Sequence, residues 1–197
     1  MTANELVKEL VTLSDEKGAL FWKAHGMLRQ GSLVALTGKA SEARQMLVSA
    51  LSEYRSTGAT LWVAAHLSYL AEVFAELAQF DEAWRRIGEA MTLIETTKER
   101  WFEAEVNRIA GELALKSPKP DAAKTETHLN RALAIARAQQ AKSWELRAAM
   151  SMARLWRDQG KRQQAHDLLV PVYGWFTEGF DTLDLKEAKA LLEQLKA

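Results

Sequence analysis

The residues of this chain that could carry chemistry do not form a known catalytic or metal-binding motif. The four histidines are widely spaced, at His25, His66, His128 and His166. None forms an HxxxH or HExxH pair that would hold a metal ion from one helix. Glu103 and Glu105 resemble a carboxylate pair, but at i, i+2 on a helix they point to different faces. We therefore expect no catalytic residue, metal or cofactor.

The nearest approach to a phosphate-binding loop is the Gly38–Lys39 step in the stretch GSLVALTGKAS. Six residues separate Gly31 from Gly38, where a P-loop has four, and Ala40 replaces the required Ser or Thr. The segment also follows a helical pattern instead of a strand. An inter-helix turn is the better interpretation, which argues against nucleotide hydrolysis by this chain.

Charge is balanced over the whole chain but divided along it. The 26 basic residues equal the 26 acidic ones, so no net field favours nucleic acid. Between residues 72 and 112 ten acidic residues accompany five basic ones, whereas between 131 and 166 eight basic residues accompany two acidic ones. Most of these residues belong to solvated helix faces, but the basic segment could also accept an anionic partner.

A repeat of about 40 residues indicates the elements that position these charges. Four tryptophans, Trp22, Trp62, Trp101 and Trp144, follow one another at intervals of 40, 39 and 43 residues, and each opens a helical pattern. A fixed period between 20 and 50 residues is typical of a solenoid, which is a scaffold for holding other molecules. We interpret the tryptophans mainly as packing residues between adjacent repeats.

The second half of each repeat keeps a regular order of small and large residues. A small residue is followed four positions later by a large apolar residue, and three positions after that by a second small residue. The four sets are Ala43, Leu47, Ala50; Ala83, Ile87, Ala90; Thr125, Leu129, Ala132; and Ala165, Leu169, Val172. This spacing resembles the second helix of a tetratricopeptide repeat (TPR). Gly31 and Gly111 occupy the small position of two first helices.

Four stretches also resemble the C-terminal TPR-like region of large bacterial signalling proteins. They are QFDEAWRRIGEAM (79–91), TTKERWFEAEVNRIAGELAL (96–115), KSWELRAAMSMARLWRDQGK (142–161) and YGWFTEGFDTLDLKEAKALLEQL (173–195). Those proteins carry a class III adenylate or guanylate cyclase domain or a DNA-binding domain, followed by a STAND-type ATPase and helical repeats. The resemblance implies a sensing or partner-binding arm, and it brings no cyclase or ATPase residues to this chain.

Composition agrees with an all-α protein. The sequence is 48% hydrophobic, with three prolines, ten glycines and many good helix formers. The absence of cysteine excludes disulfides and thiolate chemistry and favours the cytoplasm. The N-terminus lacks a signal-peptide core, and no apolar run is typical of a membrane span.

The pattern predicts ten helices in one domain over residues 1–197. The four repeat units are 19–56, 60–97, 99–140 and 142–177, with terminal helices at 3–17 and 182–196. Within the units we expect helices at 19–36, 39–56, 60–77, 80–97, 99–115, 120–140, 142–159 and 162–177. Pro171 should kink the last of these. The predicted fold is a right-handed α-solenoid of about four TPR-like hairpins.

The first helices of TPR units line the concave groove, and the repeat register assigns residues to it. The predicted ligand- or partner-binding residues are His25, Ser68, Glu72, Glu105, Arg108, Glu112, Arg147, Met150, Arg154 and Arg157. The groove would change from neutral through acidic to basic along the chain. Its arginines could bind a carboxylate, a phosphate or an acidic peptide, or could simply pair with Glu105, Glu112 and their neighbours.

An apolar stripe near the N-terminus suggests a second interaction. Leu6, Val7, Leu10 and Val11 recur at helical spacing before the first complete unit. Because terminal repeats need a polar outer face, this stripe indicates either excision from a longer chain or self-association.

Together these patterns predict a non-catalytic interaction or sensing module of bacterial signalling that binds a protein or peptide. The alternative is a regulatory domain, part of a cyclase or ATPase, that holds a small anionic ligand.

Overall fold

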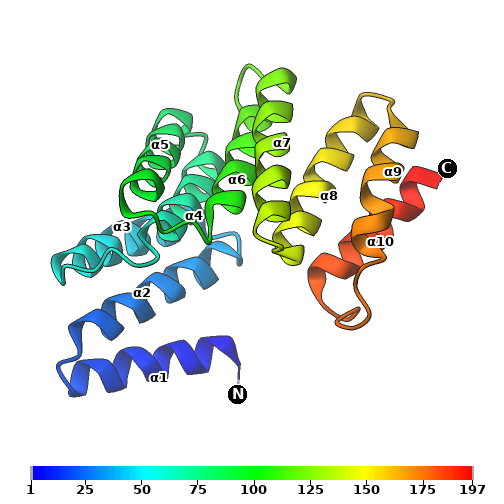
Figure 1. The fold of residues 1–197 in the computed structure, drawn as a ribbon. Helices are drawn as coiled ribbons and strands as arrows, with labels where there is room; N and C mark the ends of the chain where they lie inside the picture. The colour runs from blue at the N-terminus through cyan, green and yellow to red at the C-terminus, as the bar shows by residue number, and fades with distance from the viewer. Residues whose placement is uncertain (1, 197) are drawn as a thin grey trace. The chain divides into compact units, whose positions relative to one another are not determined.

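The computed structural model describes residues 2–196, and over that range it contains ten α-helices and no strand (Figure 1). They are α1 (Ala3–Glu16), α2 (Leu20–Ala35), α3 (Ala40–Ser56), α4 (Val63–Glu76), α5 (Phe80–Thr97), α6 (Glu103–Lys116), α7 (Ala122–Ala138), α8 (Lys142–Asp158), α9 (Arg162–Tyr173) and α10 (Leu183–Lys196). The all-α prediction is confirmed, and each predicted boundary lies within four residues of the observed one. None of the helices in the described range is long and apolar enough to cross a membrane.

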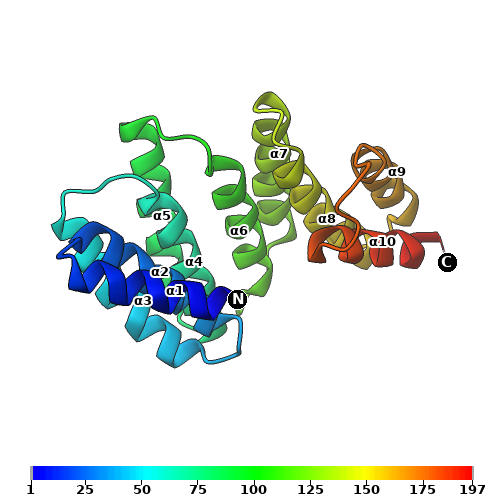
Figure 2. The same cartoon turned by 90° about the horizontal axis from the view of Figure 1, so that it is seen from below.

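The chain forms two compact units, Met1–Arg100 and Trp101–Ala197. Unit 1 contains the hairpins α2–α3 and α4–α5, preceded by α1. Unit 2 contains the hairpins α6–α7 and α8–α9, followed by α10, which lies beside both α8 and α9 (Figure 2). That all 197 residues act as one domain stays a prediction.

Backbone conformation explains why α4 begins later than predicted. Trp62 adopts a left-handed conformation with φ of 63°, which a helix cannot contain, so α4 begins at the next residue. The Trp62 N–H donates a 2.8 Å hydrogen bond to the Glu99 carboxylate, which lies just after α5. This contact joins the start of one helix to the end of its hairpin partner.

Helix α9 contains Pro171 and ends earlier than predicted, while a kink at Pro171 stays a prediction. Proline has no backbone N–H, so it cannot bond the carbonyl four residues earlier. The helix ends at Tyr173, two residues after the proline, where the prediction extended it to 177. Gly174 closes the final turn by donating its N–H to the Val170 carbonyl.

The small residues of the repeat allow the helices of each hairpin to pack closely. All twelve positions of the small–large–small pattern are buried, each at most 5% exposed. A Cβ atom added to Gly31 would lie 2.9 Å from Leu47 Cγ, and one added to Gly111 would lie 3.0 Å from Leu129 Cγ. Real Cβ atoms seldom approach so closely, so glycine sets the distance between α2 and α3 and between α6 and α7.

Replacing Ala90 with leucine is therefore expected to destabilise unit 1. Ala90 is fully buried on α5, and extra carbon atoms in a well-packed site cost about 1–3 kcal/mol. Circular dichroism melts should show a lower midpoint for Ala90→Leu than for Ala123→Leu, which changes an exposed alanine on α7. Equal midpoints for the two variants would show that Ala90 does not control helix packing.

The N-terminal helix is capped and packs against the first hairpin. Thr2 and Glu5 form a reciprocal capping box at the start of α1. Leu10 and Val11 are half-buried against Gly26 of α2, where an added Cβ atom would lie 2.8 Å from Val11 Cγ2. The α2 helix thus covers part of the predicted apolar stripe, while Leu6 stays 52% exposed. Self-association through this stripe stays a prediction.

Candidate functional site

The first helices of unit 2 carry a network of ion pairs. On α6, the Arg108 guanidinium donates two hydrogen bonds of 2.9 Å to the two carboxylate oxygens of Glu105. Arg108 also pairs with Glu112, one turn further along the same helix. From α8, Arg147 Nη2 reaches the Glu105 carboxylate at 2.8 Å. Two arginines and two glutamates therefore neutralise one another across α6 and α8.

The centre of this network is withdrawn from solvent. Glu105 is 1% exposed and Arg108 is 5% exposed. Burial alone would raise the pKa of Glu112, but the Arg108 charge and a hydrogen bond from Ser151 outweigh burial and lower that pKa. Glu112 therefore remains ionised at neutral pH, and the arrangement is an ion-pair network instead of an acid–base couple.

Ser151 and Trp144 complete the network and were not predicted as site residues. The Ser151 hydroxyl on α8 donates a 2.8 Å hydrogen bond to Glu112, and the Arg147 guanidinium lies 5.6 Å from the centre of the Trp144 ring. Both contacts orient side chains between α6 and α8. Ser151 could have been found from the register, because it follows Arg147 by one turn on the same helix face.

The remaining predicted arginines lie further along α8, where α10 faces them. Arg154 Nη2 lies 2.7 Å from Glu187 Oε2, and Arg157 Nη1 donates a 2.7 Å hydrogen bond to Gln194. These side chains line a cavity of about 200 Å³ between α8 and α10, together with Ala190 and Leu191. Unlike Arg108, both arginines keep part of their surface in solvent. Two predicted site residues thus border a cavity between α8 and α10.

Three other predicted residues have different surroundings. Met150 is 3% exposed within the apolar core of unit 2. In unit 1, Ser68 is fully buried and its hydroxyl donates to the Ala64 carbonyl, whereas Glu72 is half-buried on α4. The predicted residues thus come together in unit 2 as two groups, the α6–α8 network and the α8–α10 cavity. Their role in binding stays a prediction.

His25 of unit 1 belongs to a buried aromatic cluster on α2, α3 and α4. Its ring lies 4.7 Å from Trp62, 5.7 Å from His66 and 6.2 Å from Tyr54, measured between ring centres. Both nitrogens of His66 and Nδ1 of His25 are buried without a hydrogen-bond partner. Burial, then the Arg29 charge and His25, lower the pKa of His66 to about 3. Both imidazoles are therefore neutral packing groups at neutral pH.

The four repeat tryptophans are not equivalent. Trp62 packs on His25 between the two hairpins of unit 1, and Trp144 packs on the buried Phe102 at 5.3 Å in unit 2. Trp22 and Trp101 are 49% and 40% exposed, and each makes an edge contact with the phenylalanine next to it in sequence. Packing between repeats is therefore observed for Trp62 and Trp144.

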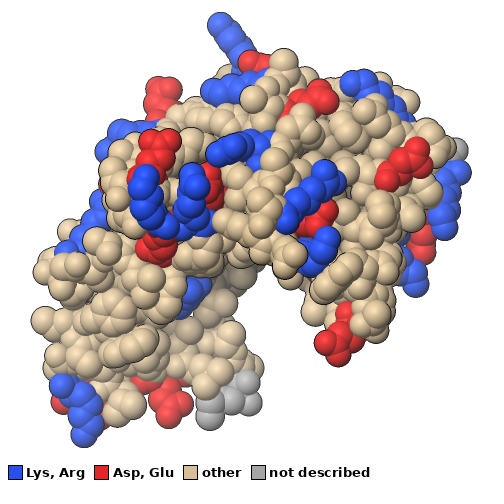
Figure 3. Space-filling view, viewed as in Figure 1, with Lys and Arg blue, Asp and Glu red and all other residues tan. Residues whose placement is uncertain are grey.

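Charged side chains of both signs are interspersed on the face shown in Figure 3, without a large area of one sign. Among residues 2–196, no group of three His, Cys, Asp or Glu side chains has an arrangement that could hold a metal ion.

Comparisons with known proteins identify the fold but no family. No protein-family model matches the chain, and no curated protein matches it in sequence. Among solved structures, it resembles a putative kinesin light chain from Podosopora anserina with nearly identical TPR-like repeats. That match has a TM-score of 0.57 at 15% identity and covers 98% of this chain and 86% of the other. A single-site variant of the same protein gives a TM-score of 0.60 at 17% identity, covering 87% and 84%. The chain thus has the TPR-like α-solenoid fold that its period predicted.

Proposed function

We propose that this protein is a non-catalytic scaffold that binds an acidic protein or peptide segment on the first helices of unit 2. The TPR-like fold supports a binding role, because such repeats present a row of equivalent helices to a partner. The proposed contact surface consists of the side chains of α8 that face α6 and α10, which we call the α8 face: Arg147, Arg154 and Arg157.

The exposure of the three arginines carries this proposal. Their side chains retain 31%, 39% and 30% of their accessible surface. Each is also held by a partner on the protein, which reduces the entropy lost when a ligand binds. Guanidinium groups fixed in this way suit a carboxylate or phosphate, because they donate two parallel hydrogen bonds.

The proposed setting is cytoplasmic signalling in bacteria. It rests on the resemblance of four stretches of the sequence to the repeat regions that follow STAND-type ATPases and nucleotide cyclases. In that setting a partner would bind the α8 face, and this binding would regulate neighbouring catalytic domains. The chain's own residues would contribute binding energy and no chemical step.

A second candidate function is the binding of a small anionic molecule. The cavity between α8 and α10 supports it, because two arginines border a hollow of about 200 Å³. A ligand there would have to displace Glu187 from Arg154 or Gln194 from Arg157. A peptide would instead extend past the cavity towards Arg147, so the two functions differ in the number of arginines they need.

A random-peptide display library tests the proposed function, because the selection does not require an identified partner. Selected peptides should be rich in Asp and Glu, and their affinity should fall as salt rises, because exposed charges are screened within about 8 Å at physiological ionic strength. Arg154→Gln/Arg157→Gln should weaken binding about tenfold or more, since interface arginines often contribute strongly. Isothermal titration with one selected peptide gives the affinities.

Arg162→Gln is the matched control, because Arg162 is an exposed arginine at the start of α9. It should bind the peptide as the unchanged protein does. Equal affinity for the double variant and the unchanged protein, with the helical content preserved, would remove Arg154 and Arg157 from the binding surface. Selection of neutral or basic peptides alone would contradict an acidic partner.

We also expect no turnover of ATP or GTP by the purified chain. The Gly38–Lys39 turn lacks the spacing and the hydroxyl residue of a phosphate loop. Incubation with either nucleotide should release no phosphate and form no cyclic product above a blank. Turnover that survives repeated purification and disappears in Lys39→Ala would contradict the non-catalytic proposal.

A further inference from the structure

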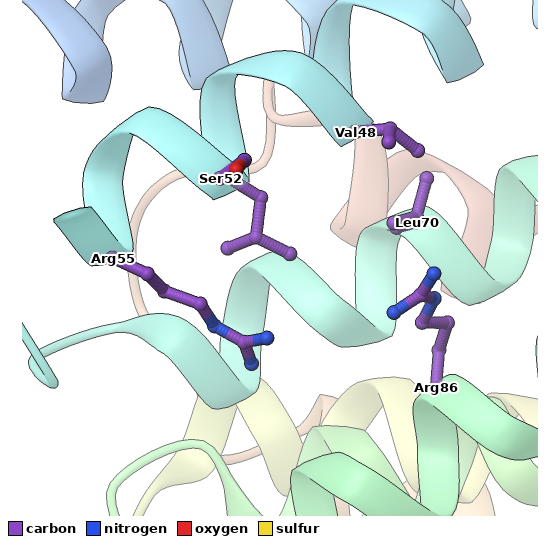
Figure 4. A pocket seen from close by; sticks show the side chains of 6 residues that line it. Val48, Ser52, Arg55, Leu70 and Arg86 are labelled. Atoms are coloured by element: carbon purple, nitrogen blue, oxygen red, sulfur yellow. The ribbon is translucent and has the colours of Figure 1, made fainter.

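A second pocket lies in unit 1, and none of its lining residues belongs to the α8 face. It is a cavity of about 240 Å³ between α3 and α5, the second helices of adjacent hairpins, and α4 forms its floor (Figure 4). Two arginines from opposite walls point towards it. Its lining residues are Val48, Leu51, Ser52, Arg55, Leu70 and Arg86.

The two arginines share one carboxylate. Arg55 Nη2 lies 2.7 Å from Glu89 Oε1, and Arg86 Nη1 donates a 3.3 Å hydrogen bond to Glu89 Oε2. Glu82 is 3.8 Å from Arg86, but it is held more closely by Arg85 at 2.6 Å. The two arginines that line the pocket therefore share Glu89, and Arg86 has Glu82 only as a more distant second partner.

Arg86 retains unused capacity for hydrogen bonds. Its side chain is 15% exposed, and its guanidinium lies 5.8 Å from the centre of the Phe74 ring. Its Nε atom is buried without a hydrogen-bond partner. A buried donor without an acceptor is unfavourable, so an anion that reached the Nε–Nη2 edge after a small side-chain rotation would relieve that cost.

Three of the six lining residues are aliphatic. Val48, Leu51 and Leu70 supply aliphatic surface beside the two guanidinium groups, and Val48 is 43% exposed. The volume of about 240 Å³ lies below the roughly 300–1,000 Å³ of pockets for drug-sized ligands. The ligand that fits is therefore small, with a charged end and a short aliphatic body.

We propose that the α3–α5 pocket binds a small aliphatic monocarboxylate. Arg55 and Arg86 hold the carboxylate, while the aliphatic body lies against Val48, Leu51 and Leu70. Ser52 also lines the same space. Inorganic phosphate would satisfy the arginines but leave the apolar wall uncovered. This site is independent of the proposed peptide binding, because it uses different helices.

Titration calorimetry with 4-methylpentanoate tests the proposal directly. The expected dissociation constant is about 1 mM or lower. This value corresponds to an ordinary binding free energy per non-hydrogen atom for so small a ligand. The uncharged 4-methylpentanamide and inorganic phosphate should each bind at least tenfold more weakly. A tripeptide ending in leucine with a free carboxylate identifies the source: tighter binding than 4-methylpentanoate indicates a chain terminus, and weaker binding indicates a free acid.

Three single substitutions separate the pocket from general charge effects. Arg86→Gln and Arg55→Gln should each weaken the binding of 4-methylpentanoate at least tenfold. Arg85→Gln is the matched control, because Arg85 lies next to Arg86 on α5, has a 58% exposed side chain and does not line the cavity. Its affinity should stay within twofold of the unchanged protein. If Arg86→Gln fails to fold, the more exposed Arg55 carries the test.

Any of three results would overturn the proposal. The first is the absence of heat of binding at 20 mM 4-methylpentanoate. The second is equal binding of the amide or of phosphate. The third is unchanged affinity in Arg55→Gln with the helical content intact. None of these results bears on the α8 face, which is tested with Arg154→Gln/Arg157→Gln.

Discussion

Replacing Glu105 with alanine is expected to lower the free energy of unfolding of unit 2 by about 3–5 kcal/mol, the usual cost of removing one partner of a buried ion pair. Arg108 is 5% exposed and gives Glu105 two hydrogen bonds, so the substitution leaves a buried cation with two acceptors fewer. Arg147 loses the same carboxylate. Urea denaturation followed by circular dichroism measures the change.

Two further variants show whether the loss comes from a buried arginine that has lost acceptors. Glu105→Gln/Arg108→Met removes both buried charges and should recover part of the lost stability, with the remainder set by Glu112 and Arg147, each of which loses a partner. Arg131→Gln breaks the exposed pair with Glu103 and should cost about 0–1 kcal/mol. A Glu105→Ala loss no larger than that of Arg131→Gln would show that the α6–α8 network contributes little to stability.

Acidification from pH 7.5 to pH 5 is expected to destabilise unit 1 through its buried histidines. The pKa of His66 is about 3 in the folded protein and about 6.5 in an unfolded chain, so the unfolded state binds the proton more readily. The stability contributed by neutral His66 is complete above pH 6.5 and is lost as the pH falls towards 3. At pH 5 the loss is about 2 kcal/mol relative to pH 7.5. His25, whose pKa is lowered by burial and by Arg29, adds to it.

Thermal melts between pH 7.5 and pH 5 measure this loss. His66→Leu should reduce the pH dependence to the part contributed by His25, because it removes the other buried imidazole. His166→Gln should retain it, since His166 lies on α9 of unit 2, where its near charged partner is the exposed Asp167. A midpoint that is constant over this range in the unchanged protein would contradict the buried neutral state of His66.

The helices could be predicted from sequence because their signals are local. The small–large–small order depends on 3.6-residue periodicity and on the need for close packing, and all twelve of its positions are buried. The helix boundaries that were predicted less accurately, such as the start of α4, depend on backbone dihedral angles. Nothing in the sequence indicates that Trp62 adopts a positive φ or that Glu99 accepts its N–H. Helix α9 continues past Pro171 and ends at Tyr173, a position that no local pattern in the sequence marks.

The candidate site could be predicted less completely, because register assigns a face but not a partner. The spacing of Arg147, Arg154 and Arg157 correctly placed them on one helix, α8. Which carboxylate each arginine meets depends on how α6 and α10 pack against α8. The α3–α5 pocket joins residues from three helices in different hairpins, and no short-range pattern links Arg55 to Arg86. The contact that joins these two arginines is their shared ion-pair partner Glu89, which is seen only in the three-dimensional structure.

The central claim is that an acidic segment binds on the α8 face, and arginine side-chain resonances test it most directly. ¹⁵N-labelled protein is titrated with a library-selected acidic peptide while the Nε–Hε signals are followed by nuclear magnetic resonance. The account predicts saturable shifts for Arg147, Arg154 and Arg157 that weaken as salt is added, with Arg162 unchanged. Binding that leaves these three signals in place and shifts only residues elsewhere would contradict it.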